Sequence, residues 1–244
     1  MQLLPRAIVT LVSAFIIALV FSATVSAQYF GFPGAFLYAL NNPKAEVFDI
    51  SPDGKIGIVL RNDPSFAHTA IISTFDPILG SQFDTKSFGF GPLAVRIAQV
   101  GNNLRAVVLT SEGGPRRIYL FDISNSGQLT QLASTQLTTS GVDGGSNLVL
   151  SGSGAVGFAA VYTDTDPEIV SFSLNDGAII KRLAVPVGPP DSLALFEGAN
   201  KRLLAFRQGL NLRVLNVLDP TQPVEVASVA LSTNGESSGA PEDV

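Results

Sequence analysis

A four-strand pattern recurs along residues 45–231 with a period of about 47 residues. Ile72, Ile118, Ile169 and Val214 take the same place in successive repeats, at spacings of 46, 51 and 45 residues. Each repeat contains four short runs rich in β-branched and aromatic residues, bounded by Gly, Pro, Asn or Asp. Four strands in about 40–50 residues is the signature of a propeller blade. We therefore predict an all-β chain that forms a β-propeller of about four recognisable four-stranded blades.

The predicted blades follow one another without a linker. Their boundaries fall at about 45–91, 92–140, 141–190 and 191–231, and a polar tail at 232–244 shows no strand pattern. An all-β sandwich also produces short strands at even spacing and is the alternative fold. Blades are favoured because strand order, turn chemistry and period recur together four times.

Four stretches carry a resemblance to a known repeat. They are SPDGKIGIVL (51–60), IYLFDISNSGQLTQLAS (118–134), EIVSFSLNDGAIIKRLAVP (168–186) and LRVLNVLDPTQPVEVASVAL (212–231). These stretches resemble the repeats of the YVTN/lactonase-like superfamily of bacterial β-propellers, which are WD40-like in architecture. The YVTN tetrapeptide itself is absent, and only the first repeat has the full SPDG turn. The resemblance implies the fold, and no catalytic residue of the family can be assigned to a residue of this chain.

The number of blades raises a question of closure. Propellers typically contain about four to eight blades, so this chain is expected to form a tight ring, to associate with a second chain, or to be an incomplete or truncated propeller. In an open array we expect the end blades to expose apolar side chains to water. The expected residues are Ile56, Ile58 and Leu60 at one end and Leu203 and Ala205 at the other.

The N-terminus has the pattern of an export signal. In residues 1–27, Arg6 is the only charged residue, residues 7–21 are predominantly apolar, and the small residues Val-Ser-Ala end at Ala27. This pattern predicts a secretory signal peptide and a secreted or periplasmic protein. The alternative is an uncleaved membrane anchor, because about 20 apolar residues suffice to span a bilayer. The aromatic-rich segment 28–44 is then predicted to supply a strand that closes the last blade, or an aromatic patch at one end of the ring.

Composition excludes several kinds of site. The chain has no Cys and only one His, so disulfides, thiolate sites and multi-histidine metal sites are excluded. A net charge of −5 argues against a nucleic-acid partner. A Ser-His-Asp triad would have to use His68, which lies in a turn-like stretch without a nucleophile elbow. We therefore expect no cofactor and no bound metal, and we assign no catalytic residue.

Several other polar residues are considered. Asp164 and Asp166 alternate in a loop and suit Ca²⁺ ligation, although an ordinary solvated turn is favoured. Glu112, Arg116 and Arg117 are expected to be solvated charges at the rim.

Aspartates near the ends of strands are predicted to stabilise turns. Asp76, Asp122 and Asp219 are expected to accept N–H bonds from the following turn, and Gly54 is expected to take a positive φ in the Ser-Pro-Asp-Gly turn.

The first strand of each repeat is the expected inner strand, and loops at the inner strands are where propeller ligands usually bind. This placement puts five charged residues near the central channel or its mouths: Glu46, Asp49, Arg96, Asp191 and Glu197. Their spacing does not demand any particular chemistry.

Two functions follow as hypotheses. The first is an exported non-catalytic β-propeller that acts as a binding or scaffold module for a protein or an extracellular ligand, with possible self-association through open blade faces. The second is a lactonase-like hydrolase or a fragment of one, which rests on resemblance alone. A third reading is a membrane-anchored sensor, if residues 7–27 are retained.

We predict cleavage between Ala27 and Gln28, because small residues stand one and three positions before that bond. Mass spectrometry of the protein recovered from outside the cytoplasm should find Gln28 at the N-terminus. An exported chain that still begins at Met1 would contradict the prediction.

Overall fold

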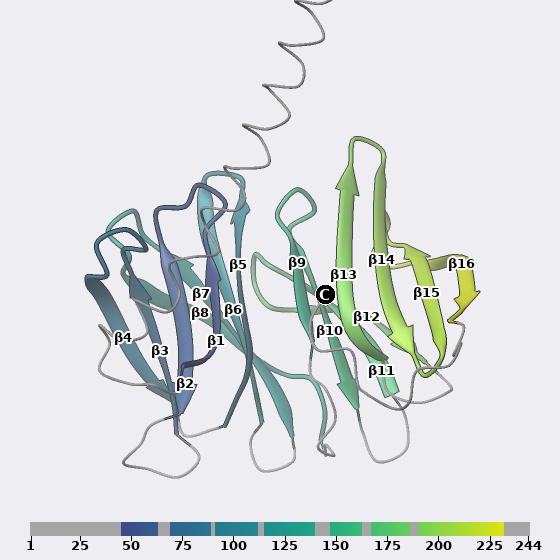
Figure 1. The fold of residues 1–244 in the computed structure, drawn as a ribbon, viewed down its shortest axis with the longest axis horizontal. Coiled ribbons are helices and arrows are strands. Elements are labelled where there is room, and N and C mark those ends of the chain that lie inside the picture. The colour runs from purple at the N-terminus through teal and green to yellow at the C-terminus, as the bar shows by residue number, and fades with distance from the viewer. Residues whose placement is uncertain are drawn as a thin grey trace, which may run out of the picture. The chain divides into compact units, whose positions relative to one another are not determined.

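The computed structural model describes residues 45–62, 69–88, 91–111, 115–139, 147–162, 167–185 and 190–231. In these ranges sixteen β-strands form four antiparallel four-stranded sheets (Figure 1). The prediction of an all-β chain with four four-stranded blades is confirmed. Over the same residues, no helix is long and apolar enough to cross a membrane. Residues 1–44 form a separate unit from residues 45–244, and the predicted signal and closing strand lie outside the described residues.

Each blade is a meander whose strands pair in chain order. Blade 1 consists of β1 (Ala45–Ile50), β2 (Gly57–Asn62), β3 (Ala70–Phe75) and β4 (Gln82–Phe88). Blade 2 consists of β5 (Gly91–Val100), β6 (Asn103–Ser111), β7 (Arg116–Ile123) and β8 (Leu129–Gln136). Blade 3 consists of β9 (Leu148–Ser151), β10 (Val156–Tyr162), β11 (Pro167–Ser173) and β12 (Ile179–Ala184). Blade 4 consists of β13 (Pro190–Gly198), β14 (Lys201–Gln208), β15 (Asn211–Asn216) and β16 (Val224–Ala230).

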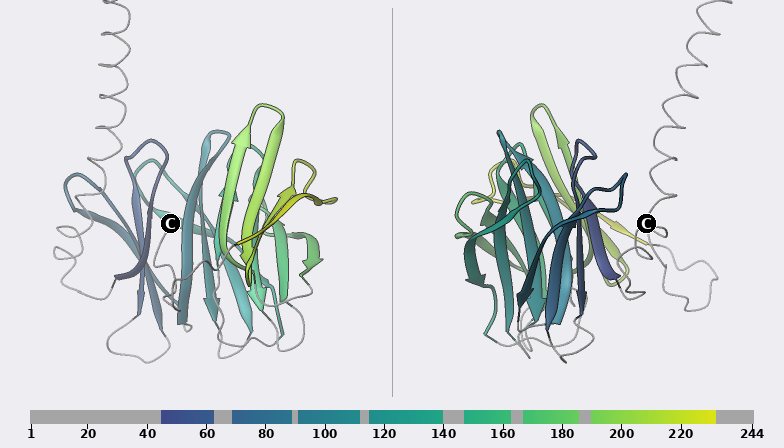
Figure 2. Two further views of the ribbon diagram at one scale, coloured as in Figure 1. Left: turned by 45° about the vertical axis from the view of Figure 1, so that its right-hand side comes forward. Right: turned by 90° about the vertical axis from the view of Figure 1, so that its left-hand side faces the viewer.

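Successive blades lie side by side, and their first strands are innermost. β1 lies against β5, β5 against β9, and β9 against β13. The fourth strands β4, β8, β12 and β16 form the outer edges and are largely exposed (Figure 2).

The core consists of three apolar layers, one between each pair of neighbouring blades. Alternate residues of the second strand face opposite neighbours. In blade 2, Ala106 and Val108 pack toward blade 1, whereas Val107 and Leu109 pack toward blade 3. A strand buried on both faces has a continuous apolar sequence, which explains the runs that reveal the repeat.

The expected exposure of blade 1 was wrong for three residues. Ile56, Ile58 and Leu60 are buried, at 7%, 0% and 0% exposure, because they face blade 2. Leu203 and Ala205 of blade 4 are half-buried and belong to no buried apolar cluster of the described residues.

A bulge and a turn recur at the periphery of each blade. The register between third and fourth strands skips one residue in every blade: Phe83, Leu132, Ile180 and Val226. The turn that follows each third strand of blades 2–4 contacts the preceding blade. Thr74 donates its hydroxyl to the Gly127 carbonyl, Thr135 to that of Gly177 at 2.8 Å, and Ser171 to that of Pro220 at 3.3 Å. These bonds fix the outer ends of the blades.

Two glycines make space for aromatic rings. Gly57 pairs with Phe75, and Gly157 pairs with Phe172. A Cβ added at Gly157 would lie 2.2 Å from Cζ of Phe172, and one added at Gly57 would lie 2.1 Å from Cζ of Phe75. Each ring therefore occupies the position that a neighbouring side chain would otherwise take.

We predict that Gly157→Ala lowers the free energy of unfolding by about 1–3 kcal/mol, since fully buried Phe172 has no room to move. Urea unfolding followed by far-UV circular dichroism measures the effect. Gly91→Ala is the matched control, because its Cβ would meet only the Ser111 carbonyl oxygen at 3.8 Å. An equal effect of both substitutions would contradict the assignment of the cost to the ring.

Candidate functional site

Asp49 joins the inner strands of blades 1 and 2. Its Oδ2 accepts the Ile97 N–H at 2.8 Å, and its Oδ1 accepts the Ile50 N–H at 3.0 Å. Burial raises the pKa of Asp49, against the opposing effect of these two N–H groups and of the Arg96 charge. The carboxylate thus links the inner strands of the two blades through the Ile97 N–H.

Glu197 performs a related role between blades 3 and 4. Its Oε1 accepts hydrogen bonds from the hydroxyls of Ser151 and Ser153, the latter at 2.6 Å, and from Arg202 Nε at 3.3 Å. Burial opposes ionisation, but these donors outweigh it and hold the pKa of Glu197 below its ordinary value. Arg202 is itself 8% exposed and also donates to the Leu218 carbonyl at 3.4 Å.

Of the predicted channel residues whose side chains the structure describes, Asp49 and Arg96 lie near each other in blades 1 and 2, whereas Glu197 lies at the junction of blades 3 and 4. Arg96 is half-buried and donates to its neighbouring Val95 carbonyl at 3.0 Å. Glu46 and Asp191 contribute backbone to β1 and β13, and their side chains lie outside what the structure describes. Asp49 and Glu197 therefore stabilise two separate blade junctions.

A surface groove lies between blades 2 and 3. Its volume is about 410 Å³, and its lining residues are Gln136, Leu137, Thr138, Thr139, Glu168 and Arg182. Arg182 Nη1 lies 2.8 Å from Glu168 Oε2, and its Nη2 donates to the Leu137 carbonyl at 2.7 Å. The exposed Thr139 and Gln136 side chains and the Glu168–Arg182 ion pair give this groove polar groups for a ligand, whereas Thr138 is only 5% exposed.

Sequence reasoning missed this groove because its residues come from two repeats. Leu137–Thr139 follow β8, whereas Glu168 and Arg182 lie on the neighbouring strands β11 and β12. The opposite charges of Glu168 and Arg182 on adjacent strands were the available signal. Nothing local in either repeat indicates that the end of β8 comes beside them.

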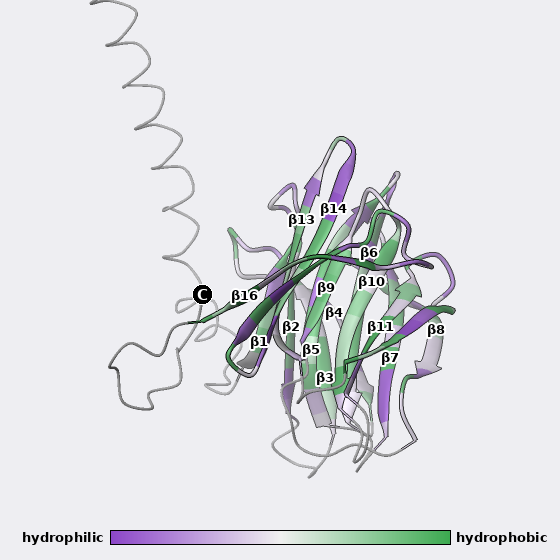
Figure 3. Cartoon of the chain, turned by 90° about the vertical axis from the view of Figure 1, so that its right-hand side faces the viewer, coloured by the Kyte–Doolittle hydropathy of each residue, from purple (hydrophilic) through white to green (hydrophobic). Residues whose placement is uncertain are grey.

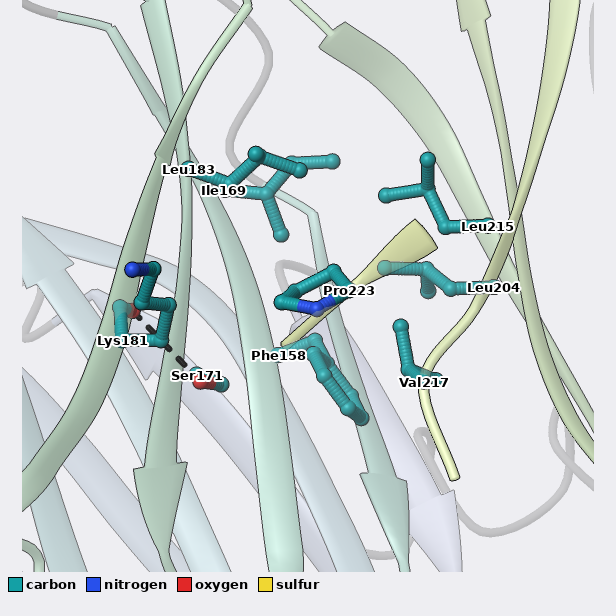
Figure 4. Close-up of a pocket in the computed structure, with 9 residues that line it drawn as sticks. All are labelled: Phe158, Ile169, Ser171, Lys181, Leu183, Leu204, Leu215, Val217 and Pro223. Atoms are coloured by element: carbon teal, nitrogen blue, oxygen red, sulfur yellow. Dashed lines mark hydrogen bonds between the residues drawn. The ribbon is translucent and has the colours of Figure 1, made fainter. Parts of the chain in front are cut away.

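A second pocket, between blades 3 and 4, is a gap in the core. Figure 4 shows Phe158, Leu204 and Leu215 converging from the two blades, with Pro223 beside them. Its volume is about 10 Å³, which accommodates no more than about one water molecule. It therefore contributes to packing between blades.

The other sequence candidates have varied outcomes. Arg117 is a surface residue, and its Nη1 donates to the Ser134 hydroxyl at 3.1 Å. Arg116 is 2% exposed, so its expected solvation was wrong; its backbone N–H donates to Thr138 Oγ1 at 2.9 Å. His68, Glu112, Asp164 and Asp166 lie outside the described residues. The described residues contain no group of three or more metal-ligating side chains.

The expected turn aspartates are confirmed at two of three positions. Asp76 accepts the Ile78 and Leu79 N–H groups at 2.8 and 2.9 Å, and Asp219 accepts the Thr221 N–H at 2.9 Å. Asp122 differs, because it lies within β7 and forms an ion pair with Arg105. Gly54 has the expected positive φ, at 72°.

We predict that Glu197→Gln lowers the free energy of unfolding by about 1 kcal/mol at pH 7, allowing for partial exposure of the carboxylate. Because the folded-state pKa is depressed, this stabilisation is present above the ordinary value of 4.5 and is lost as the pH falls through the folded-state pKa. Urea unfolding at pH 7 and pH 3 should show the difference from the native chain shrinking at the lower pH. Glu225→Gln on exposed β16 controls for loss of a charge, and a pH-independent deficit in Glu197→Gln would contradict the assignment.

No family model matches the chain, and no curated protein matches it. Solved structures do match. A candidate 6-phosphogluconolactonase from Bacteroides fragilis NCTC 9343 is 18% identical with a TM-score of 0.55, and the match covers 78% of this chain and 58% of that one. The β-propeller domain of Cps50 (Swd1) from Myceliophteria thermophila is 15% identical with a TM-score of 0.50, covering 75% and 57%.

A third match is KlAtg21, whose structure was solved in complex with the coiled coil of AgAtg16. It is 14% identical with a TM-score of 0.55, and the match covers 75% of this chain and 55% of that one. This chain therefore spans just over half the length of these solved structures. At such low identity the similarity establishes the architecture, and that architecture is a β-propeller.

Proposed function

We propose that the chain is an exported, non-catalytic β-propeller that acts as a binding or scaffold module. The main support for this proposal is that two inner-strand carboxylates form hydrogen bonds at the junctions between blades. Asp49 and Glu197, two of the four acids expected near the channel, accept hydrogen bonds between blades and so help to hold the array together. The donors around Glu197 stabilise its ionised form and make it a poor general base, and both oxygens of Asp49 already accept backbone N–H groups.

The groove between blades 2 and 3 is the proposed ligand site. The Thr139 hydroxyl and the Gln136 amide can exchange hydrogen bonds with a protein segment or an extracellular ligand, while the Glu168–Arg182 pair orders one wall. The structural match to KlAtg21, solved with a coiled-coil partner, is consistent with a propeller serving as a protein-binding scaffold. Export rests on the signal pattern of residues 1–27.

The alternative function is a lactonase-like hydrolase or a fragment of one. The match to the Bacteroides fragilis protein favours it, since that protein is described as a candidate 6-phosphogluconolactonase. In this chain the groove would be the site, with Glu168 as its carboxylate and Thr139 as its exposed hydroxyl. The ion pair between Glu168 and Arg182 argues against Glu168 as a base, because Glu168 Oε2 already accepts a hydrogen bond from Arg182 Nη1 at 2.8 Å.

We predict that the purified protein hydrolyses 6-phosphogluconolactone no faster than buffer alone. Proton release at constant pH measures the rate over a range of substrate concentrations. A saturable rate above background that Glu168→Gln abolishes, and that Glu225→Gln leaves unchanged, would contradict the non-catalytic proposal.

Binding is tested on an array of peptides and glycans. A ligand of the groove should lose at least about tenfold in affinity in the Glu168→Gln/Arg182→Gln double variant, which removes both charges and keeps the net charge constant. Binding that is unchanged in this variant would place the ligand elsewhere.

A further inference from the structure

The groove between blades 2 and 3 holds one fixed pair of opposite charges. Arg182 is bonded at two of its nitrogens, since Nη1 lies 2.8 Å from Glu168 Oε2 and Nη2 donates to the Leu137 carbonyl at 2.7 Å. These bonds connect β12 of blade 3 to the chain that follows β8 of blade 2. The guanidinium is therefore held in one orientation, and the charged side chains that line the groove have no net charge.

Two further arginines lie near this end of blade 2, and neither lines the groove. Arg116 is 2% exposed, so a ligand cannot reach its charge. Arg117 takes the same side of β7 as Tyr119, which packs toward blade 1. Its Nη1 donates to the Ser134 hydroxyl at 3.1 Å. A charged ligand in the groove would thus meet one repelling group for each attracting group.

The ion pair leaves an acceptor and donors side by side. Glu168 uses Oε2 in the pair, and its Oε1 accepts no hydrogen bond from the part of the chain that the structure describes. Arg182 carries more N–H groups than its two contacts use. The side chains of Arg182 and Glu168 are 40% and 21% exposed, so both reach solvent in the groove. The exposed Thr139 adds a hydroxyl that can donate or accept.

This arrangement suits two neighbouring hydroxyl groups on one ligand. One hydroxyl can donate to Glu168 Oε1 while the next accepts from Arg182, because a hydroxyl serves in either role. Both bonds would be assisted by a full charge, which makes them about twice as strong as bonds between neutral groups. The ligand itself should be neutral, since Arg182 repels a cation and Glu168 repels an anion.

The groove has little apolar surface with which to bind a protein side chain. Leu137 has the only wholly hydrocarbon side chain among the described lining residues, and at 1% exposure it belongs to the layer between blades 2 and 3. Figure 3 shows that hydrophobic residues dominate β10, whereas β8 mixes hydrophilic and hydrophobic residues. Protein partners usually gain affinity by filling a desolvated pocket with an anchor side chain. A ligand rich in hydroxyl groups needs no such pocket.

We propose that this groove binds a neutral saccharide through two neighbouring hydroxyl groups, one donating to Glu168 and the other accepting from Arg182. The inference rests on the proposed binding function and names the ligand class for the same site. The groove volume of about 410 Å³ lies within the range of small-molecule sites, about 300–1,000 Å³. Thr139 supplies a further hydrogen bond at the exposed end of β8.

A glycan microarray tests the ligand class with the purified protein. It carries neutral glycans that end in glucose, galactose or mannose, matched glycans that end in glucuronate or unacetylated glucosamine, and peptides. We expect retention on neutral glycans alone. Their affinity should change by less than about twofold between about 50 and 500 mM NaCl, because a neutral ligand has no charge for salt to screen.

Isothermal titration calorimetry with a retained glycan then locates the site. Glu168→Gln should lower the affinity at least about tenfold, because it replaces a charged acceptor by a neutral one. Thr139→Val should lower it about threefold, through the loss of one neutral hydrogen bond.

Two matched controls should bind normally. Glu225→Gln removes the carboxylate of a similar ion pair, with Arg213, from the adjacent strands of blade 4, and Thr130→Val changes an exposed threonine at the other end of β8. Circular dichroism should be the same for all four variants.

The outcomes separate this inference from the proposed function. Retention of a charged glycan or a peptide, lost in Glu168→Gln, would overturn the saccharide assignment and leave the binding function standing. A neutral glycan bound equally well by the native chain, Glu168→Gln and Thr139→Val would also overturn it, because that ligand binds elsewhere. If neither glycans nor peptides are retained, the inference and the proposed function both fail.

Discussion

Apolar contact between successive blades is the constraint on which the structure depends. Each sheet has two hydrophobic faces and little else to bury them, so a blade is stable only between neighbours. Three layers meet this need in the described array, with Ile58 and Leu60 in the first, Val107 and Leu109 in the second, and Phe158 in the third. Within a blade, each strand pairs with the next strand in the chain. The position of one blade relative to the next is set by the apolar layer between them.

Polar groups are placed where the layers end. Asp49 and Glu197 bond adjacent blades at the inner strands, and the hydroxyls of Thr74, Thr135 and Ser171 do so at the periphery. Such bonds define the stagger of one blade on the next, which a non-directional apolar contact cannot do. The same division explains why the groove beside Arg182 occurs at a junction, where two blades diverge beyond their shared core.

The sequence predicted local features well and relations between blades poorly. Strand identity followed from apolar runs such as FAAVY at 158–162, and the Ser-Pro-Asp-Gly turn from its own chemistry. The prediction that Ile58 faces away from the other blades was wrong. A strand buried on both faces lacks the alternation of apolar and polar residues that would show which face each side chain takes. Asp49 was placed near the channel, but its bond to Ile97 crosses between repeats, and no single repeat contains that information.

The strict pairing of strands in chain order has a consequence for how the protein forms. Each strand finds its partner within a few tens of residues, so the entropy of loop closure stays small at every step. A growing chain can complete one sheet, and the apolar face of that sheet is then available for the next blade to pack against. Assembly during synthesis would then proceed in one direction, from β1 toward β16, with each new blade stabilising the one made before it.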